Sequence, residues 1–207
     1  VGRDLLELGR PDVLLALAMT FVVMAAGFVL IPNIAAYLLG NVGYPRERLG
    51  LLYLAGGIFS FFTLRLVGRL VDRFGSARVG TFGTVLVSVV IYLGFIVFPP
   101  ALPVMMIFVL FMISMGFRNV AYNTLMSRVP APEERARFGS MQSAVQHLAA
   151  SIAAFASAQM LRELPDHTLA GIPLVAWTSI GLGALVVPFL WIVESRVTRR
   201  RAREAGA

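Results

Sequence analysis

The sequence contains no cysteine and no lysine, and only 14% of its 207 residues are charged. The absence of cysteine excludes disulfides, thiolate metal ligands and cysteine nucleophiles. A phosphate-binding loop of the form G-x-x-x-x-G-K-[ST] is excluded too, because that loop requires a lysine. An ordinary soluble domain is about one quarter charged. The small charged fraction therefore argues against water as the main solvent of this chain.

Apolar sequence takes the place of charge, since 58% of the residues are hydrophobic. A helix needs about 20 predominantly apolar residues to cross the hydrocarbon core of a membrane. Six stretches reach this length, and they lack the period-2 alternation of membrane β-barrel strands. We therefore predict an all-α membrane protein that is not an enzyme and needs no metal or cofactor. The predicted transmembrane helices are residues 13–39, 47–68, 78–98, 103–128, 136–161 and 172–194.

The 18 arginines alternate between the two ends of the predicted helices. If the N-terminal end of this segment is cytoplasmic, fourteen arginines fall inside and three outside, as the positive-inside rule requires. We therefore predict a multi-pass protein of the cytoplasmic (inner) membrane with both ends of the segment inside. Residues 195–207 then form a basic tail on anionic headgroups, which explains the net charge of +7 better than nucleic-acid binding does. The three outside are Arg46, Arg48 and Arg162, and Arg118 lies within a helix.

Polar side chains concentrate in the fourth and fifth predicted helices. Arg118 is the one strongly charged residue deep inside a predicted helix, where insertion costs about 2.5–3.5 kcal/mol unless a partner or water is near. Two roles remain open for it: contact with a substrate, or hydrogen bonds to carbonyls and amides inside the bundle. His147 could carry a proton, but a packed or hydrogen-bonded histidine explains it better.

Dense charge separates the second and third predicted helices, where residues 66–78 read L-V-G-R-L-V-D-R-F-G-S-A-R. Residues 68–78 resemble the loop signature of the major facilitator superfamily, G-x-L-a-D-R-x-G-R-R. Ser76 and Ala77 replace the usual basic pair, and Arg78 follows one place late. The shared residues are Gly68, Leu70, Asp72, Arg73 and Gly75.

Further resemblances cover most of the chain. I-P-N-I-A-A-Y-L at 31–38 and L-Y-L-A-G-G at 52–57 look like the opening of the second half of bacterial drug- and sugar-efflux members. R-A-R-F-G-S-M-Q-S-A-V-Q-H-L-A at 135–149 is similar to their eleventh helix. The resemblance therefore implies the C-terminal six-helix half of a twelve-helix transporter, with residues 1–12 as the linker between the halves.

This resemblance implies a function and a set of site residues. The function is alternating-access transport of a small molecule, with proton-coupled efflux by an antiporter as the expected mode and no cofactor. In the family, the loop at 68–78 locks one half against the other, so the partner of Asp72 would lie in the N-terminal half; a solvated turn is the alternative. The residues expected to face the substrate cavity are Asn33, Tyr37, Arg118, Asn119 and Asn123, with Gln146 as a weaker addition.

Two alternatives stay open. The segment could be a half-size protein that pairs with a second copy or another half. An intramembrane hydrolase built on Ser140 or Ser143 with His147 is a remote possibility, because no G-x-S-x-G elbow or third catalytic residue is evident. Glu194 resembles the acid that ends many facilitator halves and is expected to pair with arginines such as Arg128 or Arg135.

Overall fold

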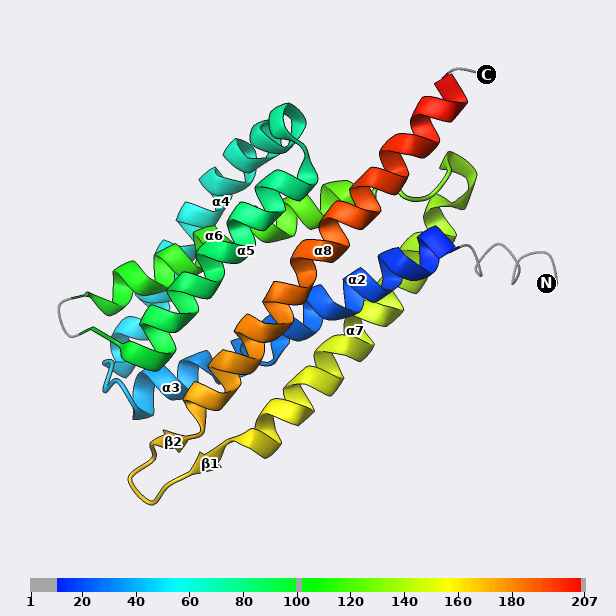
Figure 1. Ribbon diagram of the computed structural model, residues 1–207. Coiled ribbons are helices and arrows are strands. Elements are labelled where there is room, and N and C mark those ends of the chain that lie inside the picture. Colours follow the sequence, from blue (N-terminus) through cyan, green and yellow to red (C-terminus); the bar gives the residue numbers. More distant parts are fainter. Residues whose placement is uncertain (1–10, 100–101, 206–207) are drawn as a thin grey trace.

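The computed structural model describes residues 11–99 and 102–205 and shows long helices packed side by side, with a short hairpin at the end opposite the C-terminus (Figure 1). Tight connections join the helices, so successive ones run in opposite directions. The elements in chain order are α2 (Pro11–Phe28), η1 (Ile31–Asn33), α3 (Ile34–Gly40), η2 (Arg46–Arg48), α4 (Leu49–Phe74), α5 (Ser76–Tyr92), the π-helical turn η3 (Leu93–Val97), α6 (Val104–Met126), η4 (Pro132–Glu134), α7 (Arg135–Met160), β1 (Arg162–Glu163), β2 (Leu169–Ala170) and α8 (Ile172–Ala205).

Within residues 11–99 and 102–205, five helices are long and apolar enough to cross a membrane, in agreement with the predicted all-α membrane fold. Among the described residues, α7 has the length but not the apolar composition, because glutamines, a histidine and serines interrupt it. Its crossing of the membrane, predicted at 136–161, stays a prediction. The five apolar spans are Pro11–Gly40, Arg46–Phe74, Ser76–Val97, Val104–Met126 and Ile172–Arg200.

Two helices extend well beyond their predicted ends. α4 continues to Phe74 instead of ending at residue 68, so most of the expected loop is helical and Gly75 alone forms the break. The reason is packing: Val67 and Val71 remain fully buried against α5 and α6 and carry the helix past the apolar stretch. α8 likewise continues through the basic tail to Ala205. Of the predicted linker, residues 1–10 lie outside the described residues.

The first span bends where a proline interrupts it. α2 ends at Phe28, the 3-10 turn η1 contains Pro32, and α3 then resumes the helix. Proline has no N–H to donate to the preceding turn, so the helix bends at this point. The span predicted at 13–39 thus consists of two helices with a bend between them.

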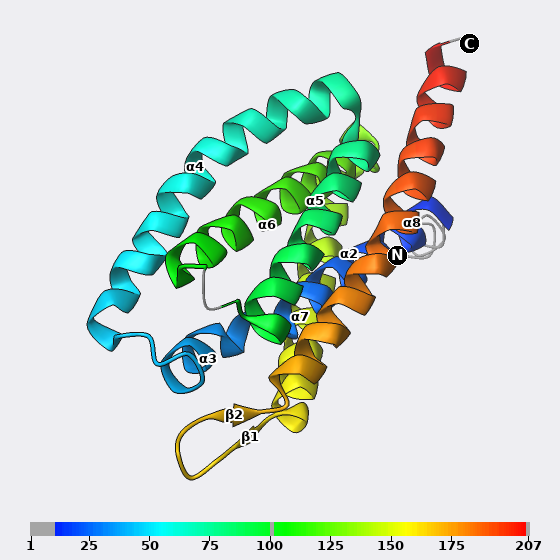
Figure 2. The same cartoon turned by 60° about the vertical axis from the view of Figure 1, so that its left-hand side comes forward.

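The helices form two groups of three that meet along α5 and α8. α6 packs against both α4 and α5, while α2 packs against both α7 and α8. α4 lies at the outer edge of its group in both views, and Figure 1 shows α7 at the outer edge of the other group (Figures 1 and 2). α4 buries less of its apolar surface than α2 or α5 does. Both edge helices therefore leave a broad face uncovered.

Close contact between α5 and α6 depends on small residues such as Gly83. A Cβ atom added to Gly83 would lie 2.6 Å from the backbone nitrogen of Arg118 and 2.7 Å from the Cβ of Phe117. Small residues let membrane helices approach at this distance. Gly83 thus lets the backbone of α6 approach α5 closely at Arg118.

Candidate functional site

Gly75 forms the whole turn between α4 and α5, and Glu194 of α8 holds it in place. Gly75 has a φ of 88°, a conformation that disfavours residues with a side chain. The Glu194 carboxylate accepts hydrogen bonds from the backbone N–H groups of Ser76 at 2.6 Å and Ala77 at 3.2 Å. A carboxylate at the positive end of a helix dipole is stabilising. The expected pairing of Glu194 with Arg128 or Arg135 is therefore replaced by a cap on α5.

Asp72 lies one turn before this break with an exposed carboxylate. The nearest cation given by the structure is not Arg73 or Arg78 but Arg128, at the end of α6, with 3.7 Å between Asp72 Oδ1 and Arg128 Nη2. The side chain of Asp72 is 75% exposed. An exposed pair of this kind contributes about 0–1 kcal/mol. Asp72 therefore keeps most of its surface open to a further partner.

The remaining motif residues divide between two faces of α4 and α5. Leu70 packs against the small cluster formed by Val67, Val71, Val79 and Ala121. Gly68 lies on the outer face, where an added Cβ would meet nothing within 4 Å. The Arg73 guanidinium lies 5.3 Å from the ring centre of Phe74, and Arg78 is exposed. The motif thus presents charge and an open glycine at the arginine-rich end, which we define by Arg69, Arg73, Arg78, Arg128, Arg196 and Arg200.

Two of the predicted cavity residues have their polar atoms bonded within the bundle. Asn33 Nδ2 donates to the hydroxyl of Ser157 on α7 at 2.7 Å. The Tyr37 hydroxyl donates to the carbonyl of Gly94 at 2.9 Å, and its ring packs against Phe95. Tyr37 is buried. These two residues connect neighbouring helices and are not brought together with the other four.

Arg118 is only 2% exposed; its backbone lies where α6 packs on α5, and its guanidinium reaches Gly27 of α2. Its Nη2 lies 3.1 Å from the sulfur of Met115, a weak acceptor. A Cβ on Gly27 of α2 would lie 3.4 Å from the same nitrogen. Its Nε has no hydrogen-bond partner within the part of the chain that the structure describes. Arg118 is therefore packed rather than presented to a cavity in this conformation.

A hydrogen-bonded network centred on Tyr122 joins α2, α6 and α7. The Tyr122 hydroxyl donates to Thr20 Oγ1 at 2.9 Å. It accepts from Gln142 Nε2 at 2.9 Å and from Gln146 Nε2 at 3.4 Å. Tyr122 and Thr20 are fully buried. Gln146 was predicted as a cavity residue, whereas Thr20, Tyr122 and Gln142 were not, although the i, i+4 spacing of the two glutamines signals a shared polar face.

Beside this network lies a cavity of about 340 Å³ between α6 and the start of α7. Gln142 belongs both to its lining and to the network. Asn119 is half-buried and Asn123, one helical turn further along α6, is exposed. The structure thus places the amide group of Gln142 at an open, partly polar space, whose lining does not include Asn119 or Asn123. The lining residues are Met126, Ser127, Pro130, Arg135, Phe138, Gly139 and Gln142.

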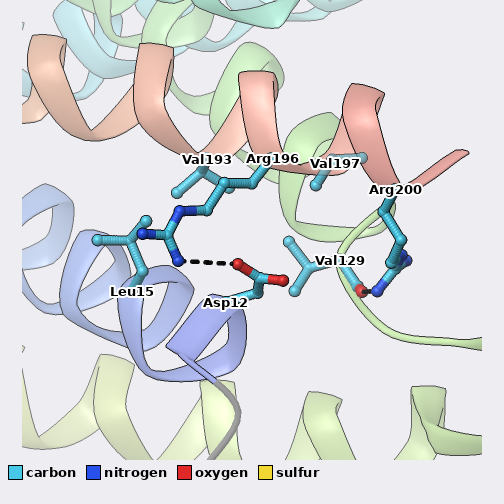
Figure 3. Close-up of a pocket in the computed structure, with 7 residues that line it drawn as sticks. All are labelled: Asp12, Leu15, Val129, Val193, Arg196, Val197 and Arg200. Carbon is cyan, nitrogen blue, oxygen red and sulfur yellow. Dashed lines mark hydrogen bonds and ion pairs between the residues drawn. The ribbon is translucent and has the colours of Figure 1, made fainter. Parts of the chain in front are cut away.

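Two arginines of the basic tail contact α2 and the connection between α6 and α7 (Figure 3). Arg196 Nη1 lies 3.0 Å from Asp12 Oδ1 at the start of α2. Arg200 donates to the carbonyl of Val129 at 2.8 Å and to that of Arg128 at 3.3 Å. These contacts fasten the extension of α8 to α2 and to the connection between α6 and α7.

The serine and histidine residues of α7 are arranged as ordinary helix residues. The Ser140 hydroxyl donates to the carbonyl of Ala136, one turn earlier in its own helix. Ser143 and His147 are exposed. Within residues 11–99 and 102–205, no three histidine or acidic side chains cluster as metal ligands would.

Comparison with known proteins gives one match. The family model described as Major Facilitator Superfamily matches residues 16–207. Searches of curated proteins and of solved structures gave no significant match.

Proposed function

Because the chain belongs to the Major Facilitator Superfamily of multi-pass membrane transporters, we propose that it forms one side of a small-molecule binding site and works by alternating access. The observation that carries this proposal is the Tyr122 network, which borders the 340 Å³ cavity through Gln142. Polar groups are costly against lipid, so within a membrane bundle they face protein, water or substrate. The polar groups beside the cavity can therefore form hydrogen bonds with a substrate.

The substrate surface we propose consists of Asn119 and Asn123 on α6 with Gln142 and Gln146 on α7. Asn33 positions α7 through its bond to Ser157 and is assigned no direct contact. Arg118 remains a candidate because its Nε lacks a partner among the described residues. It reaches a substrate only if its guanidinium leaves the contact with Gly27 of α2 during the transport cycle.

A second six-helix unit completes the site in this proposal, and α4 offers the surface for it. Gly50, Gly57 and Gly68 fall within about 20° of one another around α4 at 100° per residue. An added Cβ at any of the three would meet nothing within 4 Å. Such glycines let a second membrane helix approach closely. Asp72 lies about 40° from Gly68, so its exposed carboxylate can reach a helix N-terminus of the same partner.

The partner is the N-terminal half in the leading version and a second copy of this chain in the alternative.

We further propose proton-coupled efflux across the inner membrane, with both ends of the segment cytoplasmic. The acids of the described residues lie at or beyond the ends of the apolar stretches. The carboxylate that carries the proton therefore belongs to the partner, and the antiporter needs both units.

Transport by the complete protein tests the function. Purified transporter is reconstituted into proteoliposomes that contain a pH-sensitive dye, and a panel of fluorescent drugs and sugars is applied against a proton gradient. At least one compound should drive proton movement. The N123A variant should transport it about five- to tenfold more slowly, because losing a hydrogen bond costs about 1–1.5 kcal/mol. The T198A variant, which changes an exposed residue of α8, is the matched control. Equal rates for N123A and T198A would remove Asn123 from the site.

A bulky residue on α4 tests the partner surface separately. Gly57→Leu should abolish transport while leaving insertion and folding intact, because the added side chain keeps the second unit away. Gly181→Leu is the matched control, since Gly181 also has open space around it but lies on α8. Crosslinking at Gly57 through an introduced cysteine identifies the partner, because the chain has no cysteine of its own. Transport by Gly57→Leu at the rate of Gly181→Leu would contradict the proposal.

A further inference from the structure

A groove of about 430 Å³ lies between α4 and α5 at the arginine-rich end. Figure 2 shows the two helices meeting at the turn near Gly75 and diverging from it, with α6 beside them. Phe117 contributes to the groove from α6. The residues that line it are Leu70, Phe74, Arg78, Val79, Phe82 and Phe117.

The lining is apolar apart from one cation. Phe82 is 55% exposed and Phe74 is 45% exposed. The ring of Phe82 meets that of Phe117 edge-on, with centroids 5.4 Å apart, which gives the groove a firm aromatic wall. A groove of this composition fits a hydrocarbon chain, because exposed apolar surface is stabilised when such a chain covers it.

Positive charge lies at the end of the groove where the helices meet. Arg78 is exposed and lines the groove in the first turn of α5. Arg73 holds its guanidinium 5.3 Å from the ring centre of Phe74, another lining residue. No acid is among the residues that line the groove. Two guanidinium groups beside an apolar groove complement a phosphate attached to an acyl chain.

The groove faces away from the surface assigned to a second helical unit. Leu70 and Phe74 lie about 200° and 240° around α4 from Gly68 at 100° per residue. A partner that packs on the glycine face of α4 therefore leaves the groove open to the bilayer. Lipid is the occupant that this position and this charge favour.

We propose that the groove is a binding site for an anionic phospholipid, with one acyl chain against Phe74, Phe82 and Phe117 and the phosphate paired with Arg78. This site differs from the general lipid shell because it combines an open apolar groove with a cation at one end. Phosphatidylglycerol should bind more tightly than phosphatidylcholine with the same acyl chains. The headgroup of phosphatidylglycerol carries a net negative charge that the arginines neutralise, whereas the headgroup of phosphatidylcholine has no net charge.

Native mass spectrometry of the detergent-purified full-length protein tests the site by titration with phosphatidylglycerol or phosphatidylcholine. Wild-type protein should retain one phosphatidylglycerol at concentrations where phosphatidylcholine is lost. R78Q should weaken phosphatidylglycerol binding about fivefold, since one basic residue near a lipid surface contributes about that factor. R199Q removes an exposed arginine of α8 outside the groove and should leave binding unchanged. L70W should fill the groove and weaken binding of both lipids.

Two outcomes would overturn the proposal. Equal retention of the two lipids by wild-type protein would show that the groove does not select charge. Equal loss of phosphatidylglycerol binding in R78Q and R199Q would show that the positive charge of the arginine-rich end attracts the lipid without a defined site. Thermal unfolding of each variant in detergent confirms that the comparison is made on folded protein.

Discussion

Removal of the Glu194 carboxylate should loosen the turn between α4 and α5. The carboxylate accepts two backbone hydrogen bonds, from Ser76 and Ala77, and both residues are fully buried. Each of these N–H groups that is left without an acceptor costs about 1–3 kcal/mol. We expect Glu194→Ala to destabilise the bundle by roughly 2–5 kcal/mol. Glu194→Gln keeps one uncharged acceptor and should lose about half of that.

Hydrogen–deuterium exchange and thermal unfolding in detergent measure this effect at two levels. Exchange at residues 75–80 should accelerate in Glu194→Ala before any change elsewhere, because the cap acts on the first turn of α5. Ser195→Ala is the matched control, since the Ser195 hydroxyl is exposed and donates only to the carbonyl of Ile192. Unaltered exchange at residues 75–80 in Glu194→Ala would refute the assignment of Glu194 as the cap of α5.

Three further predictions follow from single contacts. Gly83→Ala should destabilise the bundle by about 1–3 kcal/mol in denaturant titrations, because its methyl group meets the α6 backbone, whereas Gly181→Ala should be close to neutral. Asp72→Asn should change unfolding by less than about 1 kcal/mol, with an effect that high salt removes, and a larger loss would place Asp72 in a buried network. Hydrogen bonds from the Thr168 hydroxyl and backbone hold the pKa of Asp166 below its usual value. These bonds therefore stabilise the hairpin fully at a pH above the pKa of Asp166 in the unfolded chain. The contribution is lost as the pH falls through the pKa of Asp166 in the folded protein. NMR titration of Thr168→Val should show a higher pKa for Asp166, and an unchanged value would exclude the hydroxyl as its main cause.

Length and composition were sufficient to locate the helices but not to predict the residues at which they end. Helical structure was predicted at 136–161 and found at Arg135–Met160, because a long stretch without proline has few alternatives in a membrane. The end of α4 was predicted six residues early. The sequence shows charge after residue 64, whereas Val67 and Val71 are held in the helix by neighbours that the sequence does not reveal.

The candidate site was harder to predict because hydrogen bonds depend on which helices are neighbours. Gln146 was expected to face the substrate cavity, which stays a prediction, and the structure bonds its amide to the Tyr122 hydroxyl. Tyr37 was expected there as well, yet its hydroxyl is bonded to Gly94. A polar residue in a membrane helix must find a partner, and composition shows the need without showing the partner.

The sequence by itself determined that this chain is an α-helical membrane protein of the Major Facilitator Superfamily, because apolar length and a local motif depend only on residues close together in the chain. The tertiary structure alone decided the partners of the charged and polar groups. Glu194 caps α5, Asp72 stays exposed, and Arg118 is packed under Gly27. These outcomes join residues far apart in sequence, and only the packing of the helices brings them within the few ångströms over which a hydrogen bond acts.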